Sequence, residues 1–482
     1  MKRLVFCFDG TWNQLAATYP SNVVLIAESV RPRAKDGTPQ IVYYNDGVGT
    51  VGDARLRGGA MGAGLINHIR EAYRFLIFNY EPGDEIFAFG FSRGAFSARS
   101  FVGFIRCAGI PQVNDAGRID DAIRLYERGG AEAESVHSEE ARAFRLKYSP
   151  RIYVEDDEED WRCRQVKDYV KGEASKLLIR YVGVWDTVGA LGVPAFIPGA
   201  RWLNRRYGYH SCDLTPGIES ARHAVAIDER RRVFAPTLWN NVDELNRERG
   251  FDSDDIHAPY QQRWYPGIHG SVGGTGPVRK LSDDALGWII AGARKAGLEL
   301  NTAKTSRIYD ISPDFRASLN SDPDSVGWTD KGWLGRLKNR LLAFDRPGPE
   351  HIWQVSAAAR RRWNAAPDEL YEKKPYRPKT LAGIAPALAM PPEESQSRYR
   401  TDGLLAEHVV APGDSLGKIA RTYYRDAALA SAIAEANRDL IDDPDELYVG
   451  WTLRIPKLVL PPEGQPDLAK PSPGSDGEAA PD

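Results

Sequence analysis

The chain of 482 residues is long enough for one large domain with appendages, and its net charge of −3 with 27% charged residues is typical of a globular protein. Without a basic surplus to neutralise phosphates, it is not expected to bind nucleic acid. The four cysteines, Cys7, Cys107, Cys163 and Cys212, form no CxxC pair. The sequence therefore predicts reduced thiols, with neither a metal site nor a dense disulfide framework.

The amino terminus resembles a signal peptide only superficially. Asp9 interrupts the apolar stretch Leu4–Phe8 after five residues. No other stretch approaches the roughly 18 apolar residues that a membrane-spanning helix needs. We expect synthesis in the cytoplasm and at most peripheral membrane contact, although a specialised secretion system could still export the chain without such a signal.

The first half of the chain alternates apolar β-type runs with helical patterns, which predicts a parallel sheet covered by helices on both faces. The expected elements, in chain order, are strands at Leu4–Phe8, Ile41–Tyr44, Glu85–Phe91 and Leu177–Trp185, with a helix over Leu65–Tyr80. The charge-rich residues 115–176 interrupt this alternation. We interpret them as a helical insertion or lid over the sheet.

Further along, the patterns predict a helix around Glu219–Arg232, a last strand over Gln262–Ile268 and a helix over Ser282–Ala296 with Ser282 as its N-cap. Residues 301–401 contain several prolines and have weak periodicity, so we expect an irregular cap or linker there. The composition changes again at His408.

The clearest motif is Gly-x-Ser-x-Gly at Gly90–Gly94, which follows a buried strand and precedes a helical pattern. The glycines permit a sharp strand-to-helix turn that lifts the hydroxyl of Ser92 above the sheet. The amide of Arg93 would then point at a developing oxyanion, as would the positive end of the helix. The motif alone is weak, but this strand and helix are the context that favours a nucleophile over an ordinary turn.

A serine nucleophile needs a base, and the base needs an orienting acid, in the chain order Ser, Asp or Glu, His for this kind of fold. Asp186 directly follows a predicted strand, at the rim expected for Ser92; a turn or helix-cap aspartate is the alternative. His269 follows the last strand in a loop that could reach across the rim. His223 competes with it, but its expected helical surroundings favour a core or surface role.

The loop after the first strand offers a second oxyanion donor through the amides of Gly10 and Thr11, with a simple tight turn as the alternative. The same residues prompt comparison with metal-dependent phosphatases that use an aspartate nucleophile. Those enzymes need a second aspartate two positions before Asp9, where this chain has Cys7. We therefore expect neither a metal nor a cofactor.

Together these motifs resemble the α/β-hydrolase domain of the type VI secretion phospholipase effectors of the Tle group. The matching segments occur in order over residues 1–300: Phe8–Asn13, Tyr44–Thr50, Gly90–Ala95, Gly183–Gly189, Asp228–Arg231 and Trp264–His269. The resemblance implies a lipase or esterase whose triad positions fall on Ser92, Asp186 and His269. One departure is that the family usually has Ser-Asp after the histidine, where this chain has Gly270-Ser271.

The C-terminal unit, residues 408–458, resembles a LysM repeat. The match comprises His408–Ala420, Ile433, Asn437, Asp443, Leu447, Gly450 and Leu453–Pro456. It implies a βααβ unit that recognises N-acetylglucosamine-containing glycans such as peptidoglycan, with candidate contacts at Gly413, Asp414, Ser415 and Asn437. A spacer or protein-docking module is the alternative. Residues 459–482, rich in Pro, Asp, Glu and Gly, are expected to form a disordered tail.

The sequence thus predicts a serine hydrolase that cleaves a carboxylic ester. The resemblance suggests a phospholipid substrate and a secreted antibacterial effector held at the target cell wall by LysM, with an immunity protein or the secretion apparatus as candidate partners. The residues themselves do not distinguish a phospholipid from a small soluble ester. The alternative function is a non-catalytic peptidoglycan-binding or structural protein built on a hydrolase scaffold.

Overall fold

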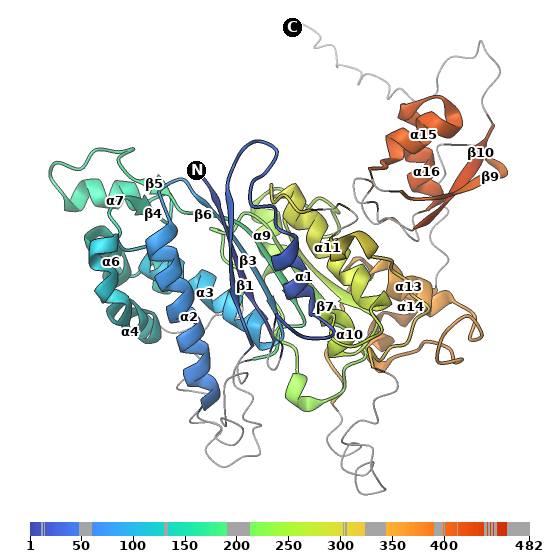
Figure 1. Ribbon diagram of the computed structural model, residues 1–482, viewed down its shortest axis with the longest axis horizontal. Helices are drawn as coiled ribbons and strands as arrows, with labels where there is room; N and C mark the ends of the chain where they lie inside the picture. The colour runs from blue at the N-terminus through green and yellow to red at the C-terminus, as the bar shows by residue number, and fades with distance from the viewer. Residues whose placement is uncertain are drawn as a thin grey trace, which may run out of the picture.

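The computed structural model describes residues 1–10, 13, 15–47, 60–129, 134–189, 213–301, 303, 306–322, 344–389, 399, 401–411, 413–437, 441, 444, 447 and 451–459. Six strands form one parallel sheet in the order β2-β1-β3-β6-β7-β8 (Figure 1). They are β1 (Arg3–Phe8), β2 (Gln40–Asn45), β3 (Glu85–Phe91), β6 (Leu178–Trp185), β7 (Ala221–Ala226) and β8 (Tyr260–Tyr265). The predicted α/β class is confirmed.

Helices cover both faces of this sheet, which is why its central strands are buried on both sides. Side chains of β1 alternate between the two cores: Leu4, Phe6 and Phe8 face one cluster, and Val5 and Cys7 face the other. The first cluster is closed by α2 (Ala60–Asn79) and α3 (Arg93–Ala108), the second by α1 (Asn22–Ser29) and α11 (Lys280–Lys295). Before residue 300, the other α-helices in the described part of the chain are α4 (Ile119–Gly129), α5 (Glu134–His137), α6 (Glu139–Tyr148), α7 (Glu158–Gln165), α9 (Val242–Glu248) and α10 (His269–Gly273).

The helix predicted around Glu219–Arg232 is wrong, because residues 221–226 form the fully buried strand β7. Its sequence, Ala-Arg-His-Ala-Val-Ala, has good helix formers, but pairing with β6 and β8 overrides that local preference. The N-cap prediction at Ser282 is also wrong. Helix α11 starts at Lys280, and the Ser282 hydroxyl instead donates to Asn22 Oδ1 at 2.9 Å.

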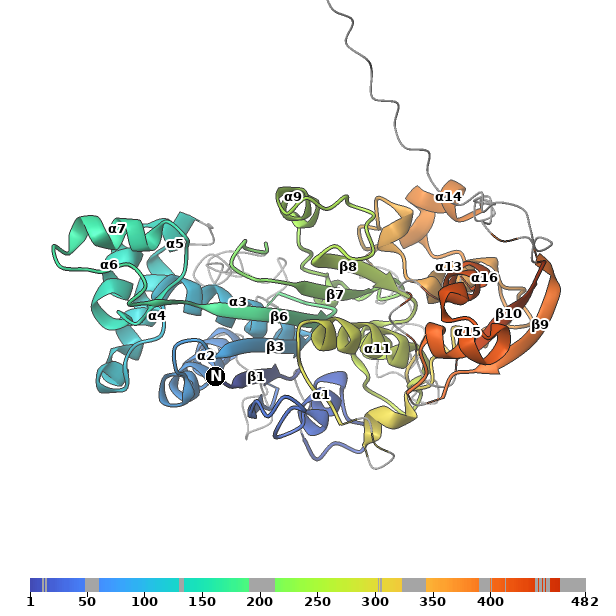
Figure 2. The same cartoon turned by 90° about the horizontal axis from the view of Figure 1, so that it is seen from above.

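Of the two interpretations of residues 115–176, an insertion or a lid, the structure favours an insertion, because the described residues of this segment lie at the opposite end of the strands from Ser92. The insertion follows the carboxyl end of α3 and leads directly into the start of β6 through β4 (Ile152–Tyr153) and β5 (Ser175–Lys176). Figure 2 shows its helices beyond the amino-terminal ends of the strands. Ser92, in contrast, follows the carboxyl end of β3.

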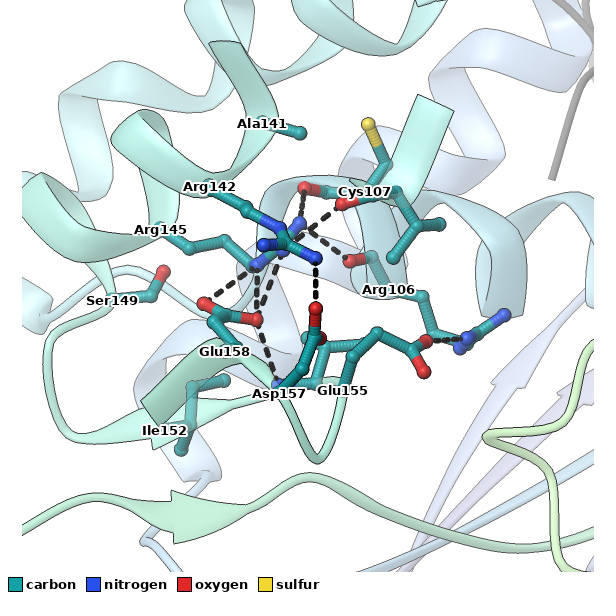
Figure 3. Close-up of polar contacts among 12 residues, drawn as sticks. Arg106, Cys107, Ala141, Arg142, Arg145, Ser149, Ile152, Glu155, Asp157 and Glu158 are labelled. Atoms are coloured by element: carbon teal, nitrogen blue, oxygen red, sulfur yellow. Dashed lines mark hydrogen bonds and ion pairs between the residues drawn. The ribbon is translucent and has the colours of Figure 1, made fainter. Parts of the chain in front are cut away.

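A buried ionic network fixes the insertion to the domain (Figure 3). Glu158 pairs with Arg145 at 2.9 Å and with Arg162 at 2.8 Å, and all three side chains are fully buried. Arg145 also donates to the carbonyl of Cys107 at 2.8 Å, and Arg106 pairs with Glu155. These bonds tie α6 and α7 to the last turn of α3, so the network has a structural role.

Residues 344–389 pack as a third core against the β7–β8 side of the sheet. Trp264 and Val225 belong to one buried cluster with Val355, Trp363 and Tyr376, and the amide of Ser356 donates to the carbonyl of Trp264 at 3.0 Å. The helices here are α13 (Ala357–Asn364) and α14 (Ala385–Ala389). This part of the predicted cap or linker is therefore an integral part of the fold.

The C-terminal unit has the predicted βααβ arrangement. Strands β9 (Thr401–Val409) and β10 (Thr452–Leu458) pair antiparallel, and between them lie α15 (Leu416–Tyr424) and α16 (Ala430–Ala436). A separate core that includes Ile419, Ile433 and Leu453 holds them together. The tail at 460–482 lies outside the described residues. No helix in the described part of the chain has the length and apolar character that crossing a bilayer requires.

Candidate active site

Ser92 sits at a strained turn between β3 and α3. Its backbone angles are φ 60° and ψ −123°, which a non-glycine residue adopts at a free-energy cost. A Cβ atom on Gly94 would lie 2.2 Å from the carbonyl oxygen of Phe8, and one on Gly90 would lie 2.4 Å from the carbonyl oxygen of Gly94. The two glycines are therefore required by close backbone approach, as expected for a nucleophile elbow.

Three residues predicted from distant parts of the sequence form one hydrogen-bonded chain. His269 Nε2 lies 2.8 Å from Ser92 Oγ, and His269 Nδ1 lies 2.5 Å from Asp186 Oδ2. Ser92 follows β3, Asp186 follows β6, and His269 starts α10 shortly after β8, so all three meet at the carboxyl edge of the sheet. His269 lies in a short helix and not in the flexible loop that the sequence suggested.

Asp186 is fully buried and accepts four hydrogen bonds. Besides His269, its donors are Arg346 Nη1 at 2.5 Å, Arg346 Nη2 at 2.9 Å and the amide of Ala226 at 2.9 Å. Burial opposes ionisation, but Arg346 and His269 outweigh it and hold the pKa of Asp186 well below its usual range. The ionised carboxylate can only accept, so Nδ1 of His269 carries the proton and Nε2 is free to accept one from Ser92.

The imidazole of His269 is held between two aromatic rings. Its centroid is 4.6 Å from that of Phe91 and 4.5 Å from that of Phe234, which stacks on it at an interplanar angle of 20°. The guanidinium group of Arg231 in turn lies over the ring of Phe234, with its central carbon 4.3 Å from the ring centroid. The apolar sandwich limits the rotation of His269 and keeps its Nε2 directed at Ser92.

Two acidic residues in the motif Asp228–Arg231 hold the backbone that carries His269. Glu229 Oε2 accepts from the amide of His269 at 3.3 Å, and Asp228 Oδ2 accepts from the amide of Gly267 at 2.7 Å. Burial raises the pKa of Asp228 to about 6, and Tyr376 donates to the same oxygen at 2.9 Å. The sequence identified this motif as a family feature but gave it no role.

The competing histidine, His223, has a structural role on β7. Its Nε2 accepts from the amide of Thr187 at 3.2 Å, so the proton is on Nδ1, which lies 2.9 Å from Gln262 Oε1. Burial lowers the pKa of His223 to about 3, which keeps the ring neutral. His223 therefore steadies the turn after Asp186 and makes no contact with Ser92 in the described hydrogen bonds.

Of the three predicted oxyanion donors, the structure supports only Arg93. Arg93 is the first residue of α3, and the first amides of a helix point out of its amino-terminal end, where Ser92 lies. The amide of Gly10, in contrast, already donates to Asp9 Oδ1 at 2.7 Å, so the structure does not support its predicted role. Thr11 lies outside the described residues. Asp9 also accepts from Ser21 and Tyr44, each at 2.8 Å, and thus organises this loop.

The departure from the family pattern at Gly270-Ser271 leaves the three-residue chain intact. Ser271 Oγ donates to the carbonyl of Leu319 at 2.7 Å, and a Cβ atom on Gly270 would lie 2.9 Å from Ser321 Oγ. Both residues therefore serve packing against the segment around Leu319. The acid that contacts His269 is Asp186, which comes from another strand.

In the C-terminal unit, the predicted glycan contacts have clear structural roles. Asn437 is 1% exposed, accepts from the amide of Arg454 at 2.8 Å and donates to two carbonyls, so its side chain is not available to a glycan as predicted. Ser415 caps α15, Asp414 lies 2.9 Å from His408 Nε2, and Gly413 adopts φ 86°. The last three remain candidates on the first strand–helix loop.

Sequence reasoning missed Arg346, Glu229 and Phe234. Only Glu229 carried a signal, because it lies in the quoted motif; Arg346 is a single arginine in a region of weak periodicity. Among the described residues, no group of three His, Cys, Asp or Glu side chains is placed to hold a metal ion. Cys7, Cys107 and Cys163 form no disulfide bond among the described residues, and Cys212 lies outside the described part of the chain.

The parallel sheet, the strained serine turn and the chain order of the three residues place the molecule in the α/β-hydrolase class. More specifically, the chain belongs to the type VI secretion phospholipase effectors with a Tle1-like catalytic domain, whose family model matches residues 2–292. A LysM domain model matches residues 408–456.

Individual relatives match smaller parts of the chain. An uncharacterised protein of Saccharomyces cerevisiae, YEL023C, is 29% identical over 248 residues, which is 48% of this chain and 32% of the yeast protein. The potassium binding protein Kbp of Escherichia coli O6:H1 is 40% identical over 50 residues, 10% of this chain and 34% of its own length. The chain thus spans about a third of each curated relative.

Two solved structures show a distant likeness. One is the Tle1 effector bound to the VgrG spike of the type VI secretion system, with 19% identity, a TM-score of 0.28 and coverage of 57% of this chain and 51% of that one. The other is an uncharacterised protein from Pseudomonas aeruginosa, with 15% identity, a TM-score of 0.35 and coverage of 93% and 75%.

Proposed function

We propose that this protein hydrolyses an acyl ester of a phospholipid, with Ser92 as nucleophile, His269 as general base and acid, and Asp186 as the group that orients and stabilises the imidazolium. The observation that carries the proposal is the continuous hydrogen-bonded chain from Ser92 Oγ through both ring nitrogens of His269 to Asp186. Membership of the phospholipase effector family supports the substrate class.

The reaction follows from the protonation states. As Ser92 Oγ attacks the ester carbonyl, its proton passes to Nε2 of His269, and Asp186 stabilises the resulting cation. The amide of Arg93, at the amino-terminal end of α3, would donate to the oxyanion of the tetrahedral intermediate. His269 then protonates the departing glycerol oxygen. In the second half, water attacks the acyl-serine by the same route and releases a fatty acid.

Product analysis tests this reaction directly. Phospholipid vesicles incubated with the full chain are expected to yield free fatty acid and lysophospholipid, because the cleaved bond is the carboxylic ester. The Ser92→Ala chain is the control for contaminating lipases. Release of diacylglycerol or phosphatidic acid would show cleavage of a phosphodiester and contradict the proposal, whereas turnover of short soluble esters alone would replace the phospholipase with an esterase.

We further propose that the LysM domain holds the enzyme in the cell wall of a target bacterium, close to membrane lipid, as part of an antibacterial effector. The separate core of this unit and its LysM match support a binding module. The full chain is expected to sediment with purified peptidoglycan, and a chain ending before Thr401 is expected to stay in solution. Equal sedimentation of the two chains, or none of either, would exclude this role.

A further inference from the structure

Arg346 contacts the proposed triad from a segment that lies beyond the residues matched by the catalytic-domain family model, 2–292. Its side chain is fully buried and faces Asp186 in a bidentate arrangement, with nitrogen–oxygen distances of 2.5 and 2.9 Å. The same guanidinium donates to the carbonyls of Ala226 at 2.8 Å and Phe234 at 2.6 Å. Arg346 therefore links three parts of the chain around His269: Asp186, Ala226 at the end of β7, and the turn that carries Phe234.

We propose that Arg346 is a positioning residue of the active centre, which locks the plane of the Asp186 carboxylate and offsets part of its negative charge. The inference rests on the proposed function. It makes residues 344–389 an obligatory part of the catalytic unit, because this segment carries Arg346 and packs through the third core against β7 and β8.

The geometry explains the orienting effect. Asp186 Oδ2 receives both His269 Nδ1 and Arg346 Nη2, while Oδ1 receives Arg346 Nη1 and the amide of Ala226. A planar guanidinium with two parallel bonds fixes the plane of a carboxylate, which a single bond does not. Turning the carboxylate about its Cβ–Cγ bond would break all four bonds, so Oδ2 stays directed at His269.

The charge effect follows from the groups around His269. Asp186 attracts a protonated imidazole, and Arg346 opposes that attraction from the far side of the same carboxylate. Glu229 accepts from the His269 backbone but is paired with Arg231 at 2.6 Å, and His223, on the adjacent strand, is neutral. Removing the guanidinium leaves the negative charge of the carboxylate unopposed, so we expect Ser92 to become reactive only at a higher pH.

The test measures how fast a fluorophosphonate labels the full chain between pH 4 and 9, in Arg346→Gln, Arg346→Lys and Arg362→Lys variants. We expect Arg346→Gln to raise, by about one to two pH units, the pH midpoint at which the labelling rate reaches half of its maximum. Below that midpoint, labelling should be about 10- to 100-fold slower than in the wild type. Arg346→Lys keeps the charge but not the bidentate fork, so we expect an unchanged midpoint with a rate about tenfold lower.

Arg362 is the matched control. It is equally buried in the same segment, donates to the carbonyls of Phe315 and Ala317 and pairs with Glu372, but has no contact with the triad. Arg362→Lys is expected to lower the melting temperature without moving the pH midpoint.

A folded Arg346→Gln chain with the wild-type midpoint and rate would overturn the inference, as would an equal shift in Arg362→Lys. If Arg346→Gln does not fold, Arg346→Lys decides: a rate within twofold of wild type at every pH contradicts a positioning role. Failure of the proposed function would look different, because the wild-type chain itself would then not be labelled at any pH.

Discussion

Replacing Ser92 by alanine is expected to lower kcat/KM for ester hydrolysis by about 10⁴-fold or more, because no other described hydroxyl is hydrogen-bonded to His269 Nε2. The fold should survive, since the substitution removes one hydrogen bond worth about 1 kcal/mol. The measurement is steady-state hydrolysis of a nitrophenyl ester at equal concentrations of folded protein. Activity within tenfold of wild type would mean that another group is the nucleophile.

A second substitution at the same position separates strain from chemistry. Ser92 has φ 60°, which glycine adopts without penalty and alanine does not. Ser92→Gly should therefore be as inactive as Ser92→Ala but more stable than it, by on the order of 1 kcal/mol. Equal unfolding free energies for the two variants would contradict the interpretation that the elbow stores backbone strain.

Removing the acid is expected to damage both rate and stability. Asp186→Ala should lower kcat by about 10³-fold or more, since nothing then holds the tautomer and orientation of His269. It also leaves Arg346 fully buried without its counter-charge, which costs about 3–5 kcal/mol in comparable buried pairs. Chemical denaturation monitored by tryptophan fluorescence measures the second effect.

The double variant Asp186→Ala, Arg346→Met distinguishes the two effects. With both charges gone, a large part of the lost stability should return, although the carbonyls of Ala226 and Phe234 lose a donor. The activity should stay low because the acid is still missing. A double variant no more stable than Asp186→Ala, or one that regains turnover, would contradict the assigned roles.

The parts of the site predicted from the sequence are those with a local signature. Gly90, Ser92 and Gly94 lie within five residues, and their chemistry is dictated by one tight turn whose flanking strand and helix have clear periodicity. Asp186 and His269 could be chosen because the strand-end positions and the chain order of the fold restrict the candidates. The C-terminal unit was predictable because its motif covers nearly the whole domain.

Features fixed by tertiary contacts were not predictable in the same way. Strand β7 has a helix-like composition and is a strand only because β6 and β8 flank it. Arg346 is one of many arginines, and nothing near it in sequence indicates that it meets Asp186, 160 residues away. Asn437 matches the LysM pattern because it satisfies backbone groups inside the domain, which a motif cannot distinguish from ligand contact.

The insertion at residues 115–176 is a different case. A helix that follows one parallel strand runs back to the amino-terminal edge before the next strand starts. An insertion between α3 and β6 must therefore join the sheet at that edge, away from Ser92. The position of the insertion could therefore have been predicted from the order of the strands and helices in the sequence. The buried pairs of Glu158 with Arg145 and Arg162 show instead that the insertion is a fixed structural appendage.

The most direct test of the account is to treat the full chain with a fluorophosphonate and map the modified peptide by mass spectrometry. We expect a single phosphonyl adduct on Ser92, lost in Ser92→Ala and strongly reduced in His269→Ala, because only a serine activated by His269 reacts at neutral pH. No adduct on folded wild-type protein, or an adduct on another residue, would contradict the assignment of this protein as a serine hydrolase acting through Ser92.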